Sequence, residues 1–193
     1  RPNTRLWFEI ENEPHDKLTN ANLKASFAPA LAAIRKSNPL RPVIIGGENW
    51  SGVDSLATLE LPDDPNIHPT FHYYEPFDFT HQGADWVKPT FPLGRQYGSD
   101  ADKARLAADL AKVKAYIART GRTPFMGETG AYDRAPLDQR IAYHTAIDQA
   151  FAGTGVGICA WGYTNSFPFW DQKTRSWLPG LLEAFGLPAT SRK

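Results

Sequence analysis

The 193-residue sequence is poor in features that would suggest disulfide bonding, membrane insertion or binding to a charged polymer. It contains one cysteine, Cys159, which excludes a disulfide within the chain, and the apolar neighbours of Cys159 predict a small buried side chain. The 21 lysines and arginines balance 21 aspartates and glutamates, so neither a nucleic acid nor an anionic membrane is indicated as a partner. The sequence also lacks an apolar run long enough to cross a membrane and an N-terminal signal-peptide pattern. A neutral partner fits this composition best.

Aromatic residues are plentiful. They make up 12% of the chain and include six tryptophans, several of which stand beside polar residues rather than inside apolar runs. Surfaces that stack sugar rings have this composition, although packing in a core can also produce it. The length fits one globular domain with a substantial core.

Apolar runs alternate with helical patterns along the chain. Each predicted strand is a nearly continuous apolar run, which is typical of a parallel sheet covered by helices, so the fold class is α/β. In such folds the chemistry gathers at the carboxyl ends of the strands, whether the sheet is open or closed into a barrel. We predict strands over residues 6–10, 43–46, 67–74, 123–127 and 155–163, helices over 20–37, 101–120, 137–151 and 178–185, a short amphipathic segment over 53–59, and a long loop over 75–100.

Polar and aromatic residues follow the predicted strands where simple turns would suffice. Two carboxylates, Glu13 and Glu128, stand at strand ends 115 positions apart (128 − 13). Cleavage of a glycosidic bond requires one protonated and one ionised carboxyl group, and a separation of about 5 Å gives retention of configuration. For either site alone a turn or loop role is the simpler interpretation. The other strand ends carry Asn12, Asn49-Trp50, His72-Tyr73-Tyr74 and Trp161.

Four motifs in order resemble glycoside hydrolase family 5, specifically its bacterial cellulases. FEIENEPH resembles the fourth-strand signature, TFHYYEPFDFTHQGA the sixth-strand His-x-Tyr segment, PFMGETGAY the seventh-strand Gly-Glu motif, and ICAWGYTNSFPFWD the eighth-strand tryptophan. The resemblance runs from about Leu6 to Leu187. It implies a (β/α)8 TIM barrel of which this chain supplies about strands 4 to 8 and their helices.

The resemblance also implies roles for individual residues. Glu13 is expected to be the acid/base and Glu128 the nucleophile, with no cofactor and no metal. For His81 and Trp86, anchoring of the loop and binding of substrate are equally good interpretations, and His68 is more simply structural. The residues expected to bind substrate are Asn12, His72, Tyr74 and Trp161, with Trp50 and Trp86 as further candidates. His72 and Tyr74 are expected as partners of both the substrate and the nucleophile.

The sequence departs from the family pattern in extent and at two positions. The first three βα units of the barrel are absent, so residues 1–193 form a partial catalytic domain, and we expect a longer polypeptide or a second polypeptide to supply them. Alone the chain should be poorly active or inactive. Glu11 stands where a hydrophobic residue is usual, and Thr129 stands where phenylalanine is common.

The resulting hypothesis is a retaining endo-β-1,4-glucanase that acts on cellulose-like glucans by double displacement. Because polymers do not enter cells, this substrate implies a secreted or periplasmic protein. One alternative is another β-glycanase, acting on mannan, xyloglucan or mixed-linkage glucan. An alternative of a different class is a non-catalytic carbohydrate-binding fragment of a split barrel.

Overall fold

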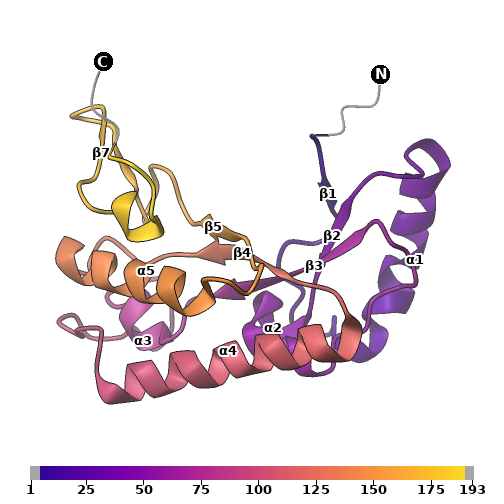
Figure 1. Cartoon of the computed structure of the whole chain (residues 1–193), viewed down its shortest axis with the longest axis horizontal. Helices are drawn as coiled ribbons and strands as arrows, with labels where there is room; N and C mark the ends of the chain where they lie inside the picture. The colour runs from indigo at the N-terminus through magenta and orange to yellow at the C-terminus, as the bar shows by residue number, and fades with distance from the viewer. Residues whose placement is uncertain (1–4, 190–193) are drawn as a thin grey trace. The chain divides into compact units, whose positions relative to one another are not determined.

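The structure is a computed structural model that describes residues 5–189 (Figure 1). The chain divides into two compact units. The first holds the residues up to His72 together with Ala111–Gly127, and the second holds Tyr73–Leu110 together with the residues from Glu128 onward. Each unit is described below by itself.

The first unit is built on parallel strands. β1 pairs with β2, with Phe8 opposite Val43, and β2 pairs with β3, with Val43 opposite Ile67. The five strands of the sheet follow the order β1-β2-β3-β4-β5, which confirms the predicted parallel α/β arrangement. The elements of this unit are β1 (Phe8–Glu9), α1 (Asn20–Ser37), β2 (Val43–Gly46), α2 (Glu48–Ser51), η1 (Val53–Ala57), most of β3 (Ile67–Tyr73), the second half of α4 (Asp100–Thr120) and the start of β4 (Phe125–Thr129).

Helix α1 covers the sheet of the first unit with an apolar stripe. Leu23 and Phe27, four residues apart, lie on the same face of the helix and are buried against the strands. Leu31 and Ile34 continue the stripe and are partly buried. The helix ends at Ser37, and the backbone amide of the capping residue Asn38 donates to the carbonyl of Ile34. The core on the strand side consists of Val43, Ile45 and Ile67.

In the second unit, helix α5 packs with one buried face and contacts the last residue of β3. Tyr143, Ile147 and Phe151 of α5 are buried. The Tyr143 hydroxyl donates to the carbonyl of Tyr73 over 3.1 Å, so α5 is held to the end of β3. The other elements of this unit are α3 (Phe77–Thr80), α5 (Leu137–Phe151), β5 (Ile158–Ala160), β6 (Trp170–Asp171), β7 (Ser176–Trp177) and η2 (Glu183–Phe185).

Several predicted boundaries are wrong. β4 begins and ends two residues later than expected, so it includes Glu128. Pro124, just before it, has no amide hydrogen to donate to a neighbouring strand. The helix predicted over 178–185 reduces to η2, since Pro179 and Gly180 (φ +84°) interrupt it. The antiparallel hairpin of β6 and β7 was not predicted.

Two strands are shorter than expected, and one residue predicted to be buried is exposed. β1 spans two residues and β5 spans three, between Gly157 and the turn at Trp161-Gly162. Cys159 in β5 is exposed, contrary to the prediction. β5 is the last strand in the sheet order, so Cys159 has a neighbouring strand on one side only.

Candidate active site

In the first unit, Glu13 follows β1 and is held by a histidine of β3. The Glu13 carboxylate accepts a hydrogen bond of 2.7 Å from His72 Nδ1. The His72 side chain is 4% exposed and that of Glu13 is 31% exposed. A carboxyl group that is open to solvent but bonded to a buried partner can meet a substrate while keeping one orientation. The adjacent Asn12 is exposed, and its carbonyl accepts from the Ser51 hydroxyl over 3.1 Å.

Close backbone packing in the first unit requires a glycine immediately before Glu128. A β-carbon on Gly127 would lie 2.5 Å from Thr70 Oγ1 and 3.3 Å from the His72 ring. The first of these distances is a clash, so any side chain at residue 127 would displace Thr70 or the strand. The Gly-Glu pair of the sequence motif thus has a packing reason.

In the second unit, Glu128 is held by the tyrosine that follows β3. The Tyr74 hydroxyl donates to the Glu128 carboxylate over 2.8 Å. The Tyr74 ring packs edge-on against His81 and Phe167, and its carbonyl accepts from the Thr80 hydroxyl over 2.6 Å. A phenol fixed at both its ring and its backbone restrains the carboxylate that it contacts.

Trp161 approaches the strand that carries Glu128. Its backbone amide donates to the Thr129 carbonyl over 2.7 Å. A β-carbon on Gly130 would lie 2.0 Å from the Trp161 carbonyl oxygen, so only glycine permits this approach. The Trp161 side chain is 42% exposed, as expected for a ring that stacks on a ligand.

The sequence matches the model of a known family. The model of the family described as cellulase (glycosyl hydrolase family 5) matches residues 1–166. The chain belongs to glycosyl hydrolase family 5. The family prediction made from the four motifs is therefore confirmed.

Known endoglucanases resemble the chain along most of its length. Endoglucanase H of Acetivibrio thermocellus is 29% identical over 191 residues, which cover 96% of this chain and 20% of the relative. The solved structure of a hyperthermophilic endo-β-1,4-glucanase in complex with substrate is 36% identical, with a TM-score of 0.88, and the match covers 94% of this chain and 59% of that one. Cel5A of Thermotoga maritima in complex with mannotriose is 33% identical, with a TM-score of 0.87 and coverages of 93% and 59%.

The likeness confirms the predicted fold class, part of a family 5 (β/α)8 barrel. The chain spans about three-fifths of the length of these solved relatives and one-fifth of Endoglucanase H. Among residues 5–189, no helix has the length and apolar character needed to cross a bilayer.

Of the remaining residues discussed as candidates, the two tryptophans are exposed and His81 is buried. Trp86 is 51% exposed and lies edge-on to Tyr132 with ring centroids 4.9 Å apart. His81 is buried, and its Nδ1 lies 2.9 Å from the Thr80 hydroxyl, which favours a loop-anchoring role for His81. Trp50 is 53% exposed. His68 contacts the ring of Trp7, 4.5 Å away between centroids.

The two departures from the family pattern are accommodated simply. Glu11 is exposed, so its charge remains in water and requires no buried cation. Thr129 is buried, and its hydroxyl lies 3.2 Å from the hydroxyl of Tyr143. That pairing satisfies a polar side chain where the family commonly has phenylalanine.

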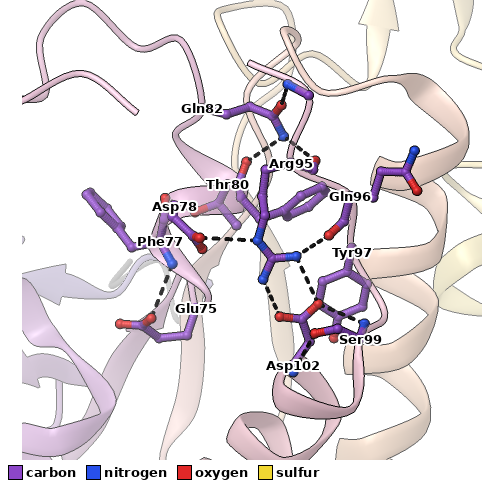
Figure 2. A network of polar contacts seen from close by, with 12 residues as sticks. Glu75, Phe77, Asp78, Thr80, Gln82, Arg95, Gln96, Tyr97, Ser99 and Asp102 are labelled. Carbon is purple, nitrogen blue, oxygen red and sulfur yellow. Dashed lines mark hydrogen bonds and ion pairs between the residues drawn. The ribbon is translucent and has the colours of Figure 1, made fainter. Parts of the chain in front are cut away.

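A network centred on Arg95 holds the long loop that carries Trp86 (Figure 2). The Arg95 guanidinium contacts both carboxylate oxygens of Asp102 and, over 3.1 Å, the carboxylate of Asp78. Burial alone would raise the pKa of Asp102, but hydrogen bonds from Arg95 and from Gly98 and Ser99 lower it to about 2. The Gln82 side chain adds bonds to the Arg95 carbonyl and the Gly94 amide. The loop is therefore ordered by ionic and backbone contacts.

Sequence reasoning missed three residues that surround the predicted ones. His15 stacks on Trp50, and Tyr132 and Phe167 both contact Trp86. The position of His15 immediately after Asn-Glu-Pro was an available signal. Tyr132 and Phe167 lie within two of the quoted motifs, but their contacts with Trp86 could not be predicted, because both come from loops whose course is set by tertiary packing.

Proposed function

We propose that this chain is part of the catalytic domain of a retaining β-1,4-glucanase, with Glu13 as acid/base and Glu128 as nucleophile. One observation carries the proposal. Each of the two glutamates has its own orienting partner, His72 for Glu13 and Tyr74 for Glu128. Oriented carboxyl groups are what double displacement requires.

The proposed reaction has two steps. In the first, the Glu13 carboxyl protonates the leaving oxygen while the Glu128 carboxylate attacks the anomeric carbon, which gives a glycosyl-enzyme. In the second, Glu13, now ionised, removes a proton from water, and the water displaces Glu128. Both steps require the two carboxyl groups to flank one glycosidic bond, at the separation of about 5 Å of retaining enzymes.

The remaining predicted residues are proposed to bind glucan. Asn12 would hydrogen-bond a hydroxyl of the sugar at the cleavage point, and the exposed rings of Trp50, Trp86 and Trp161 would stack on sugar faces. Another β-glycan is a second candidate substrate, since the Cel5A relative from Thermotoga maritima takes mannotriose as a substrate in its solved complex. Hydrolysis of a panel of cellulose, mannan, xyloglucan and mixed-linkage glucan distinguishes these substrates.

We also propose that a second polypeptide, or another part of a longer one, supplies the remaining barrel strands. The support is that the chain covers 59% of a solved relative at a TM-score of 0.88. A polymeric substrate further implies a secreted or periplasmic location. Hydrolysis of a chromogenic cellobioside by the chain alone and by its mixture with the N-terminal family 5 segment separates an incomplete enzyme from a non-catalytic binding fragment.

Two substitutions test the catalytic roles. Glu128→Gln should abolish turnover while cellohexaose binding persists, because only the nucleophile is lost. Glu13→Gln should reduce hydrolysis of unactivated oligosaccharides far more than that of aryl glycosides, whose leaving groups need little protonation. Steady-state kinetics on both substrate classes, with each variant mixed with the N-terminal family 5 segment, provide the measurement.

The control is Glu11→Gln, which removes an exposed carboxylate two residues from Glu13 and should leave both rates unchanged. Equal losses on the two substrate classes for Glu13→Gln would remove its assignment as acid. Full activity of Glu128→Gln would remove its assignment as nucleophile.

A further inference from the structure

Three contacts join the segment after β1 to the turn that carries Trp50. The Ser51 hydroxyl donates to the Asn12 carbonyl over 3.1 Å, and the Trp50 amide donates to the Pro14 carbonyl over 2.9 Å. The imidazole of His15 stacks on the Trp50 indole, with ring centroids 5.1 Å apart and planes 7° from parallel. The residues on both sides of Glu13 are thus tied to the Trp50 turn.

The turn itself has an unfavourable backbone conformation. Asn49, Trp50 and Ser51 have φ values of 54°, 56° and 55°, in the left-handed region that residues with a β-carbon avoid. Consecutive residues persist in this region only where their surroundings hold them. The three contacts provide that support, and the turn presents a tryptophan that is 53% exposed.

The His15 ring is locked from its own segment. Nδ1 lies 2.6 Å from the Glu13 carbonyl oxygen. A carbonyl oxygen only accepts hydrogen bonds, so Nδ1 carries the hydrogen and donates it. This bond fixes the plane of the imidazole. Because the Trp50 indole stacks parallel to the imidazole, the orientation of the indole is restricted as well.

We propose that His15 is a positioning residue that holds the Trp50 indole in the orientation that receives a sugar ring of a β-glucan. This inference rests on the proposed function. A large aromatic ring loses less conformational entropy on binding when a neighbour already restricts it. Because the same histidine is bonded to the backbone of Glu13, the stacking ring and the acid/base segment keep a fixed spacing.

The test follows the Trp50 ring directly by fluorine NMR of protein labelled with 5-fluorotryptophan. The chain has six tryptophans, and Trp50→Phe assigns the resonance. His15→Ala should shift and broaden the Trp50 signal. His68→Ala is the matched control, since it removes another histidine-tryptophan contact in the same unit and should move the Trp7 signal instead. An unchanged Trp50 signal in His15→Ala would overturn the positioning role.

Binding of cellohexaose, measured by calorimetry in Glu128→Gln protein, tests the link to glycan. His15→Ala should weaken binding roughly three- to tenfold, the effect of losing one aromatic pair, and His15→Phe should restore most of it. A Trp50 signal that moves in His15→Ala without any change in cellohexaose affinity would overturn the glycan role of the pair. No cellohexaose binding by the parent protein mixed with the N-terminal family 5 segment would overturn the proposed function, while the fluorine spectra would still decide whether His15 positions Trp50.

Discussion

Tyr74 donates to Glu128 over 2.8 Å while its ring is held between His81 and Phe167. Hydrogen bonds to charged groups contribute about 1.5 to 3 kcal/mol. Tyr74→Phe keeps the ring and removes the donor, so kcat should fall roughly 10- to 150-fold with little change in thermal stability. Kinetics on cellotetraose in the presence of the N-terminal family 5 segment and a thermal unfolding curve provide the measurement.

The matched control for Tyr74→Phe is Tyr116→Phe, which removes the hydroxyl of a buried tyrosine in α4. It should leave kcat unchanged. A loss of kcat as large as that of Tyr74→Phe would show that removing a buried hydroxyl anywhere in the fold explains the effect.

His144 of α5 is fully buried among aromatic rings, including Phe169 and Phe185. Burial lowers its pKa to about 3. Between pH 6.5 and pH 3 the unfolded chain therefore binds a proton at His144 that the folded chain does not, so stability falls as pH falls through this window. His144→Phe should flatten this dependence by roughly 1 kcal/mol per pH unit.

Urea unfolding at pH 4, 5, 6 and 7 measures the effect of His144→Phe, with the denaturant slope m checking that the same surface is exposed. A parent protein and variant with parallel stability curves would show that His144 does not contribute to the acid sensitivity.

At the scale of elements, ion pairs and hydrogen bonds join the start of α4 to the long loop before it. The Asp102 side chain is 2% exposed and accepts from Arg95 and from two backbone amides (Figure 2). Arg95→Lys keeps the charge but loses the planar fork that contacts both oxygens. It should lower the free energy of unfolding by about 1 to 3 kcal/mol and expose residues 83–94 to protease.

The control is Lys103→Ala, because the Lys103–Asp100 pair of the same helix is exposed on both sides and contributes almost nothing. Limited proteolysis with mass spectrometry and urea unfolding measure both variants. Equal protection of the loop in Arg95→Lys and in the parent protein would show that the loop is ordered without the fork.

Local periodicity predicted some elements well. The spacing of apolar residues located α1 and α5 almost to the residue, since one face of each helix is buried. The strands were harder, because a parallel strand is defined by its neighbours. β5 is a three-residue strand inside a nine-residue apolar run, and only its pairing in the sheet reveals where the strand begins and ends.

At the scale of the whole molecule, β1 and β5 are the two end strands of the sheet order. Cys159 in β5 is exposed and is the single cysteine of the chain, so it reports on whatever covers that strand. If the remaining family 5 strands pair there, labelling of Cys159 by a maleimide should be fast for the chain alone and slower after the N-terminal family 5 segment is added.

Mass spectrometry of the labelled protein measures the rate, and an unrelated protein at the same concentration is the control. A mixture that gains hydrolysis of the chromogenic cellobioside while the labelling rate of Cys159 stays unchanged would show that the barrel is completed without covering Cys159.

The sequence by itself determined the family and which residue types stand at the strand ends. Four short motifs sufficed, because catalysis requires particular side chains at particular points along the chain. Glu13, His72, Tyr74 and Glu128 could all be named in this way.

Only the tertiary structure decided which side chains hold these residues in place. The pairing of Glu13 with His72, of Glu128 with Tyr74, and of Trp50 with His15 joins positions up to 59 residues apart. Such pairs arise where strands and loops meet in space, and no local pattern encodes that meeting. Packing likewise decided that Cys159 is exposed and His144 buried, since burial depends on what lies beyond the residue's own segment.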